Sequence, residues 1–541
     1  MCLVRLVMAL RNAAQSDAAL ERVEGLLRVY PDSGPLYALK AWLLLRRGAA
    51  DDALIFLEQA RLSDVPREGY YWVARHMVAL ERGQKEAAEQ AILKGAELLP
   101  AAAFAQLKAA RFYWREARLD QAIRFYQAAI QAGADSAEAW VELGMALEAA
   151  GRPEEALDAF RRAFGLEPGN PSVARHLSGL LGSTGRHLEA LLVFKQAAEA
   201  RPDRLELLTG YADMAAELWR TGEAEEAYAN ALRREPDSLH GRVGLARMLA
   251  RQGRRAEARA MLQELLVAQA DYQPARIALA DVLAVEGQGE AAVGMLQEAM
   301  RSPHYEVTAR MALACLFLRA GRPDDAIQEA QVAVAAQPDA ESYGLLARAF
   351  AAAQQWEKAE VTVKKALESG PRAPLAHLAA AGLAAARGQT EQAIAEAEEA
   401  VRLAPYLPEA LTFAGTLYLR LDRAQDCARV WAQAAQLNPW DPALQWDLAE
   451  VLRTRLSRPA EAAQHYRRHI ELKGERSEDA ERLLREFEAA PQGKQPRART
   501  FWSGAPAGHE PWHSAPLRPI ITGGLSLQEP YGRTQEDGTQ R

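Results

Sequence analysis

One pattern returns along this chain about every 34 residues, and it is clearest between Ala137 and Pro168. Its first half places apolar residues three or four positions apart, which puts them on one face of a helix: Trp140, Leu143, Gly144 and Leu147. Gly151 then breaks the helical pattern, and Pro153 suits the first turn of a second helix. The second half again places residues on one face: Ala156, Phe160 and Ala163. The pattern predicts a helical hairpin that is too small to fold without neighbours.

The recurrence of this hairpin constrains the fold more than any single motif. The closing proline returns at Pro31, Pro66, Pro100, Pro168, Pro202, Pro236, Pro338, Pro371, Pro405 and Pro439. Where that proline is missing, small residues of the second helix keep the phase, as Ala122 and Ala258 do. The spacing predicts some thirteen hairpins over residues 35–473, stacked in one array with no interior linker.

At these positions the sequence resembles the tetratricopeptide repeat. The repeat pattern has Trp, Leu-Gly and Tyr on its first helix, and Ala, Phe, Ala and a closing Pro on its second. The matching residues are Trp140, Leu143, Gly144, Ala156, Phe160, Ala163 and Pro168, and Leu147 stands where Tyr is usual. The resemblance implies an all-α, right-handed α-solenoid of helical hairpins that binds other proteins.

Three further segments flank the predicted array. Residues 1–34 are expected to form an incomplete N-terminal repeat, and residues 474–490 a capping helix whose pattern runs over Ser477–Ala490. Residues 491–541 contain seven prolines and seven glycines without helical periodicity, which predicts a disordered tail. Its scattered apolar residues leave two interpretations open: the tail is solvated, or it docks onto a partner or into the groove of the array.

Some repeats depart from the pattern. In the sixth hairpin Gly222 comes three residues late, so the first helix is expected to continue past Trp219. In the last hairpin Glu450 and His469 take positions that are usually small, which predicts fraying toward that end.

Composition excludes several classes of function. The formal net charge of the 541 residues is −7, so no general basic surface for nucleic acid is expected. No stretch approaches the ~18 uninterrupted apolar residues of a membrane-spanning helix. Oligomeric state and partner identity cannot be inferred from the sequence.

The cysteines and the first residues bear on the compartment. Cys2, Cys315 and Cys427 are too scattered for a disulfide framework or a CxxC metal site, and Cys427 takes a small-residue position that predicts a packed thiol. Met1–Leu10 is interpreted as the first helix of an incomplete repeat rather than a signal peptide. We therefore expect a cytoplasmic protein. A start further upstream that carries a signal would instead predict the periplasm.

The sequence contains no constellation for catalysis, a cofactor or a metal. His465 and His469 are four residues apart, but the glutamate of a zinc-protease helix is absent, so a surface pair is expected. A phosphate-binding loop of the GxxxxGK[ST] type does not occur. The chain is therefore predicted not to be an enzyme, with no catalytic, cofactor-binding or metal residues.

In tetratricopeptide proteins the first helices line a concave groove that holds a peptide. In the first three hairpins the corresponding positions form an apolar strip with one cation: Ala38, Trp42, Leu45, Val73, Met77, Leu80, Leu107, Arg111 and Trp114. Further along they are Met145, Gly179, Asp213, Arg247, Asp281, Cys315 and Arg348, which alternate in charge. One hypothesis is that the strip holds an apolar partner segment and the charged positions give selectivity. The alternative is that Trp42 and Trp114 only pack inside a tight superhelix.

The resemblance implies a non-catalytic scaffold or adaptor that binds partner segments in this groove. Two alternatives remain: an accessory subunit of a bacterial secretion, polysaccharide or envelope-assembly machine, and the regulatory part of a glycosyltransferase or sulfotransferase system. Binding of chaperone tails is not expected, because the clamp positions hold Val141, Met145, Arg175 and Gly179.

Overall fold

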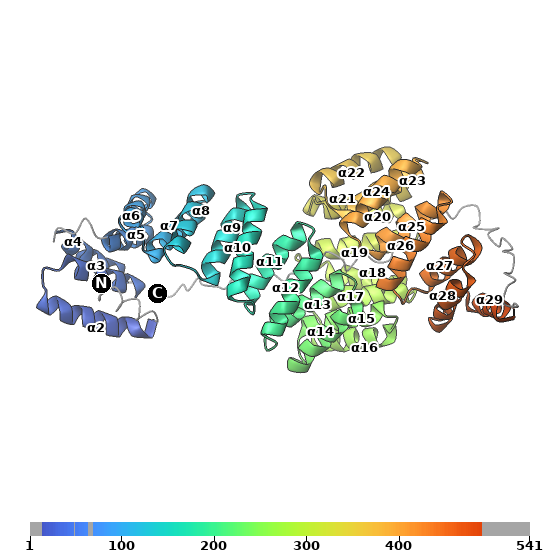
Figure 1. Ribbon diagram of the computed structural model, residues 1–541, viewed down its shortest axis with the longest axis horizontal. Helices are drawn as coiled ribbons and strands as arrows, with labels where there is room; N and C mark the ends of the chain where they lie inside the picture. Colours follow the sequence, from blue (N-terminus) through green and yellow to red (C-terminus); the bar gives the residue numbers. More distant parts are fainter. Residues whose placement is uncertain (1–12, 48, 63–68, 490–541) are drawn as a thin grey trace. The chain divides into compact units, whose positions relative to one another are not determined.

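The computed structural model describes residues 13–47, 49–62 and 69–489 (Figure 1). Met1–Leu10 and the predicted tail at 491–541 therefore lie outside the described residues. Within the described ranges all the regular structure is helical, as the hairpin pattern predicts. The chain divides into two compact units, residues 1–184 and residues 185–541.

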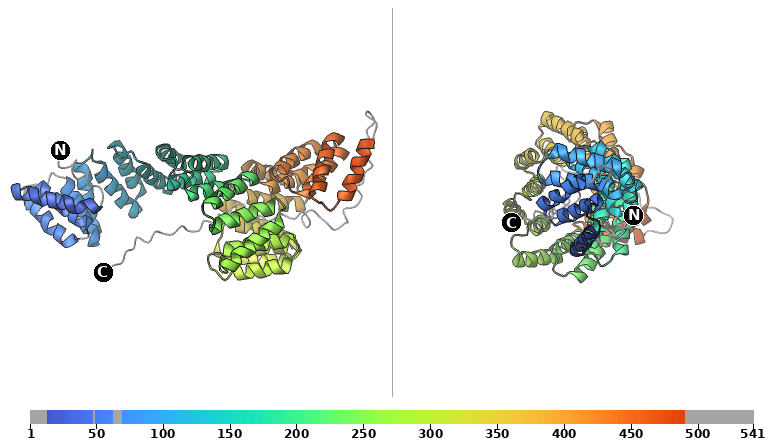
Figure 2. Two further views of the ribbon diagram at one scale, coloured as in Figure 1. Left: turned by 90° about the horizontal axis from the view of Figure 1, so that it is seen from below. Right: turned by 90° about the vertical axis from the view of Figure 1, so that its left-hand side faces the viewer.

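Both units are built from successive helices that pair as hairpins (Figure 2). The first unit contains α2 (Ala13–Val29), α3 (Gly34–Arg46), α4 (Ala50–Leu62), α5 (Gly69–Glu81), α6 (Lys85–Leu98), α7 (Ala103–Arg115), α8 (Leu119–Gln131), α9 (Ala137–Ala149), α10 (Pro153–Leu166) and α11 (Pro171–Ser183).

The second unit continues the same alternation of first and second helices. It contains α12 (His187–Ala200), α13 (Leu205–Glu217), α14 (Thr221–Arg234), α15 (Leu239–Arg251), α16 (Arg255–Ala268), α17 (Gln273–Val285), α18 (Gly289–Ala299), α19 (Glu306–Arg319), α20 (Pro323–Ala336), α21 (Ala340–Ala352), α22 (Trp356–Ser369), α23 (Pro374–Ala386), α24 (Thr390–Leu403), α25 (Pro408–Arg420), α26 (Ala424–Leu437), α27 (Pro442–Thr454), α28 (Pro459–Glu471) and α29 (Ser477–Ala489).

The hairpin of α9 and α10 forms where the sequence predicts it. The side chain of Ser136 accepts a hydrogen bond from the backbone N–H of Ala139, which caps α9. Gly151 has φ +72° in the turn, a left-handed conformation that glycine adopts without a steric penalty. Pro153 then begins α10, where its missing N–H leaves no hydrogen bond unmade.

Several hairpin turns reach the same left-handed conformation without glycine, and Trp219 and Gln354 are two examples. Trp219 has φ +57° and Gln354 has φ +58°. The prediction that the sixth first helix continues past Trp219 is wrong: α13 ends at Glu217 and α14 begins at Thr221. The packing of the two helices fixes the position of the turn, and Trp219 adopts the backbone conformation that this turn requires.

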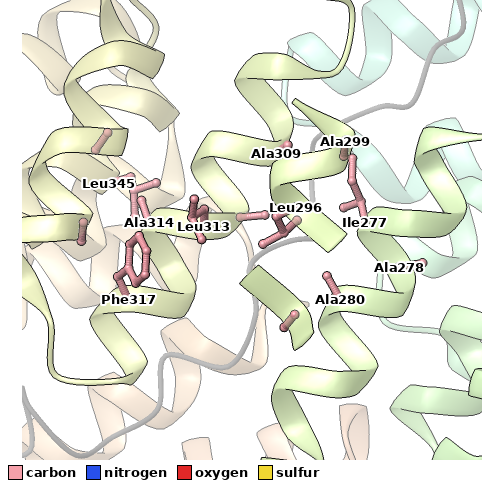
Figure 3. Close-up of a cluster of buried hydrophobic side chains, with 14 of the residues drawn as sticks. Ile277, Ala278, Ala280, Leu296, Ala299, Ala309, Leu313, Ala314, Phe317 and Leu345 are labelled. Carbon is pink, nitrogen blue, oxygen red and sulfur yellow. The ribbon is translucent and has the colours of Figure 1, made fainter. Parts of the chain in front are cut away.

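The core is a continuous layer between the helices of each stack rather than a central globule. In the second unit the largest cluster extends from Val243 to Leu383. Figure 3 shows Ile277 of α17, Leu296 of α18 and Leu313 of α19 meeting in this layer, with small residues such as Ala299 between the backbones. Alanine lets neighbouring helices approach closely while leucine and isoleucine fill the remaining space.

The last hairpin is fully formed, and the predicted fraying is wrong. Its second helix, α28, runs to Glu471, and α29 packs against it with Ala480 buried. His469 is only 3% exposed, and its Nδ1 lies 2.7 Å from the carbonyl oxygen of Pro442. The expected surface pair of histidines is therefore also wrong, because His469 is a core residue.

Candidate partner-binding surface and charged interior

The groove residues predicted in the first unit lie on consecutive first helices. Met77 is on α5, Arg111 on α7 and Met145 on α9, and the side chain of each is half-buried. Leu80 and Trp114 lie three residues further along their helices. Leu80 is 38% exposed and Trp114 is half-buried. We call Met77, Leu80, Arg111, Trp114 and Met145 the first-unit stripe.

Two other predicted residues of this strip cannot be placed in the same way. Trp42 and Leu45 belong to α3, but their side chains lie outside the described residues. Both therefore stay predictions.

Arg111 is held by two carboxylates of the next repeat. Its Nε lies 2.9 Å and 3.0 Å from the two carboxylate oxygens of Glu142, and its Nη2 lies 2.7 Å from Glu138. All three residues keep part of their surface in contact with solvent. The first-unit stripe thus combines apolar side chains with a pre-formed network of ion pairs, which can orient a polar group of a partner.

In the second unit Asp213 is also engaged by its neighbours. Both of its carboxylate oxygens lie 2.9 Å from Nε2 of His240, and the hydroxyl of Tyr228 donates to it. Burial, followed by the charge of Asp213, raises the pKa of Tyr228 well above its ordinary value. Asp213 therefore contributes to the structure of the stack and presents only part of its carboxylate to solvent.

The remaining predicted residues follow one another on the next first helices. Arg247 is on α15, Asp281 on α17, Cys315 on α19 and Arg348 on α21, and the side chain of each is half-buried. Burial raises the pKa of Asp281 to about 7, although Arg247 and two other arginines, Arg319 and Arg251, act to lower it.

A second set of charges, which the repeat pattern did not predict, faces these residues. Glu409 at the start of α25 is buried, and its charge interacts with Arg251 of α15 and Arg348 of α21. The charge of Glu341 on α21 acts on Glu217 at the end of α13 and helps to raise the pKa of Glu217. Residues more than a hundred positions apart in the sequence therefore face the same interior of the second unit.

An aromatic contact closes this interior. The ring of Tyr406, just before α25, meets the ring of His187 on α12 edge-on, with centroids 5.3 Å apart. Tyr406 also packs against the apolar cluster that contains Leu191 and Leu218. The array between α12 and α25 thus turns back onto itself within the second unit. No regularity within a single repeat could predict which repeats meet in this way.

Across the described ranges no group of three or more His, Cys, Asp or Glu side chains is arranged to hold a metal ion. Within those ranges, none of the helices has the length and apolar character that crossing a membrane requires. Cys427 is fully buried, and burial raises the pKa of its thiol to about 12, in agreement with a packed thiol.

Comparison with known families agrees with the hairpin pattern. A profile described as Tetratricopeptide repeat matches residues 107–171, 277–341, 345–408 and 414–475, and a second profile of that description matches residues 214–282. Together these segments cover more than half of the chain. The chain belongs to the tetratricopeptide repeat family. The matched segments occur in both units of this tetratricopeptide protein, so the resemblance stated from the sequence is confirmed.

Similar helical arrays occur among solved structures. A chain of the Naa15/Naa10 complex bound to HypK-THB is 16% identical with a TM-score of 0.32, over 90% of this chain and 77% of that one. A chain of the APC/C hetero-tetramer Cut9-Hcn1 is 15% identical with a TM-score of 0.41, over 90% of this chain and 94% of that one. Both similarities are too weak to add to the functional argument. No curated protein matches the sequence.

Proposed function

We propose that this tetratricopeptide protein is a non-catalytic scaffold or adaptor, and that the first-unit stripe binds a segment of a partner protein. Tetratricopeptide repeats generally bind proteins and do not catalyse reactions, which supports the general assignment. The repeated helices expose a long side-chain surface without needing any movement to form it. Such a preorganised surface lowers the entropic cost of capturing a partner.

One observation carries the proposal for this surface. Leu80 on α5 is 38% exposed, and Met77 on α5 and Trp114 on α7 are half-buried, so apolar area remains in contact with water. Covering apolar area contributes about 25 cal/mol per Å². Arg111, three residues before Trp114 on α7, forms an ion pair with Glu138 that provides a polar edge. An apolar centre with a polar edge is the usual arrangement of a protein interface.

The composition supports proteins as the partners and the cytoplasm as the compartment. A net charge of −7 disfavours binding to nucleic acid, and three scattered cysteines favour a reducing environment.

The proposal is tested by affinity capture with the full chain and a matched pair of variants. Leu80→Ser changes the first-unit stripe, whereas Leu93→Ser changes a leucine on α6, the second helix of the same hairpin, that is 39% exposed. Captured proteins are cross-linked and identified by mass spectrometry, and circular dichroism checks that both variants keep their helices. We expect Leu80→Ser to lose partners that Leu93→Ser retains, with cross-links that map to α5, α7 and α9.

Partners that survive Leu80→Ser and Trp114→Ala together would contradict the assignment to this surface. Equal losses in Leu80→Ser and Leu93→Ser would show that general apolar exposure, rather than the first-unit stripe, governs capture.

A further inference from the structure

One histidine of the first unit stands where the two helices of a hairpin cross. We call the crossing position the residue of the first helix that lies twelve positions before the recurring small residue of the second helix, as Gly144 lies before Ala156. In many hairpins this position holds a buried alanine or glycine: Ala41, Ala110, Gly144, Ala212, Ala246 and Gly415. In the hairpin of α5 and α6 it holds His76, twelve positions before Ala88. A titratable ring thus takes a place that a small residue fills in those hairpins.

The imidazole ring of His76 is enclosed by α5, α6 and α7. His76 is 2% exposed, and its Nδ1 lies 2.8 Å from the backbone carbonyl oxygen of Ala88. Its ring meets the ring of Phe112 on α7 edge-on, with centroids 5.3 Å apart. Because a carbonyl oxygen only accepts hydrogen bonds, Nδ1 carries a hydrogen and donates it. In the neutral ring the other nitrogen, Nε2, is therefore unprotonated.

A second proton on this ring would find no partner in the protein. The hydrogen bond to Ala88 is the one that His76 makes within the described residues, and His76 forms no ion pair with any of them. Protonation would therefore place a positive charge and an additional N–H group in the core of the hairpin. Burying a charge without a partner disfavours the packed state.

The nearest charges also oppose protonation of His76. Burial lowers the pKa of His76, the hydrogen bond to Ala88 acts to raise it, and the charges of Lys108 and Arg115 on α7 lower it further. The sequences of α3 and α7 contain no acidic residue. The acids of α4, α5 and α6 whose side chains the structure describes are exposed or bound to other groups: Asp52, Glu58, Glu81, Glu86, Glu89 and Glu97. No nearby acid therefore offsets a charge on His76 within the described residues.

The cations on the same helices are exposed or engaged elsewhere. Lys40 on α3 pairs with Glu24, and Lys85 on α6 pairs with Glu116. Lys94 and Arg75 both lie over the ring of Trp72. Arg82, which follows α5, is exposed. Lys108 and Arg115 are therefore the charged groups that act on the buried ring.

His76 is placed between the two helices that carry most of the first-unit stripe. Met77 follows it directly on α5, and Leu80 lies four residues after it. On α7, Phe112 contacts the ring of His76 and directly follows Arg111. A change in the contact between His76 and Phe112 would therefore change how the stripe residues of α5 lie relative to those of α7.

We propose that His76 is a proton-sensitive switch that regulates the first-unit stripe. With a neutral ring, α5 packs against α6 and α7, and the stripe keeps the arrangement that binds a partner segment. With a protonated ring this packing loosens, and the stripe loses that arrangement. The regulation of partner binding rests on the proposed function, whereas the loosening of α5, α6 and α7 does not depend on it.

The direction of the pH dependence follows from the burial of the ring. The pKa of His76 in the folded state is below its ordinary value of 6.5, so the folded state binds fewer protons than the unfolded state. The packing around His76 is therefore fully stable above this value and weakens as pH falls through it.

The test measures hydrogen exchange by mass spectrometry on the full chain at pH 7.5 and pH 5.5, with labelling times scaled for the intrinsic exchange rate. His76→Gln removes the titratable ring and keeps an N–H group that can donate to the carbonyl of Ala88. The control is His176→Gln, which changes a half-buried histidine of α11 that stacks on Phe160. Peptides from α26 provide a reference within the same chain.

We expect the protection of α5, α6 and α7 to fall at least fivefold between pH 7.5 and pH 5.5 in the parent and in the control. In His76→Gln it should fall less than twofold, and the protection of α26 should not fall in any of the three. His76→Ala, which places the residue of α3 and α7 at this crossing position, should behave as His76→Gln does. Unchanged protection of α5, α6 and α7 in the parent, or an equal fall in both His76 variants, would overturn the proposal and leave His76 as an ordinary core residue.

A second experiment separates the switch from the proposed function. Partners that the full chain captures through Leu80 are tested again at both pH values. The parent should capture at least fivefold less of them at pH 5.5, whereas His76→Gln should capture similar amounts at both. Capture through Leu80 that does not change with pH would overturn the regulation and leave the stripe as a binding surface. Capture that is independent of Leu80 would overturn the proposed function instead, and hydrogen exchange would still decide whether His76 controls the packing.

Discussion

Gly144 on α9 and Phe160 on α10 approach so closely that no other residue fits at position 144 without movement. A Cβ atom added at Gly144 would lie 2.5 Å from Cε1 of Phe160, whose side chain is fully buried. This contact fixes the crossing of the two helices. The hairpin pattern of the sequence places Gly144 on one face of the first helix and Phe160 on one face of the second, and this contact joins the two faces.

Gly144→Ala should therefore destabilise the first unit by about 1–3 kcal/mol, because the ring of Phe160 must shift to accept a methyl group. The measurement is the midpoint of thermal or urea unfolding. Gly179→Ala is the control, since Gly179 is exposed on α11 with nothing within 4 Å of an added Cβ. The control should be neutral or stabilising by up to about 1 kcal/mol. Equal losses in the two variants would exclude a tight contact at Gly144.

The hairpin turns allow a reciprocal test of backbone conformation. Ala117 is exposed in the turn between α7 and α8 with φ +55°, the region in which a residue with a Cβ is strained. Ala117→Gly should therefore stabilise the chain by about 1 kcal/mol, and Gly151→Ala should destabilise it by a similar amount. Melting temperatures of both variants check this. A decrease for Ala117→Gly, or no decrease for Gly151→Ala, would show that the positive φ carries no strain.

Glu217 predicts a pH dependence of stability. Burial, followed by the charges of Asp213 and Glu341, raises its pKa in the folded state to about 7 from an ordinary 4.5. The folded state thus binds more protons than the unfolded state between these values. Stability that is present below pH 4.5 is therefore lost as pH rises to about 7.

Glu217→Gln should remove part of this loss, so that the variant is about 1–2 kcal/mol more stable than the parent at pH 8 and similar to it at pH 5. Denaturant unfolding at a series of pH values provides the measurement. Glu391→Gln, which changes an exposed residue of α24, should keep the slope of the parent. An unchanged slope in Glu217→Gln would contradict the assignment.

The burial of Cys427 predicts slow alkylation of its thiol. Its side chain is fully buried, and burial raises the pKa of the thiol to about 12, so little thiolate is present at pH 8. Iodoacetamide should leave Cys427 unmodified in the folded chain and should react on the order of 100-fold faster in 8 M urea. Peptide mass spectrometry after a timed reaction measures both rates. Rapid modification of the folded chain would mean that the second unit opens around α26.

The parts of the fold that depend on local spacing could be predicted from the sequence. Ala137 to Pro168 gave both helices of a hairpin, because Gly151 and Pro153 determine the turn through their own backbone preferences. Trp219 was predicted wrongly because hairpin packing imposed a left-handed conformation on a residue that does not favour it. His469 was predicted wrongly because its ring has a buried carbonyl partner that no pattern of apolar residues indicates.

Less of the candidate sites could be predicted. Arg247, Asp281 and Arg348 share one position of the repeat, so periodicity placed them on neighbouring first helices. Glu409 and Tyr406 lie opposite them because the array turns back on itself, and that closure depends on small rotations summed over many repeats. The spacing within one repeat does not specify this sum. Trp42 and Leu45 stay predictions.

The contact between His187 and Tyr406 changes how this segment can vary in length. An open stack gains or loses a hairpin at the cost of one interface, since every unit touches only the units beside it. Between α12 and α25, however, deleting 34 residues would carry Tyr406 away from His187 and separate Glu409 from Arg251. These contacts therefore constrain the number of hairpins between α12 and α25. Deleting a single hairpin there should disrupt all of these contacts at once.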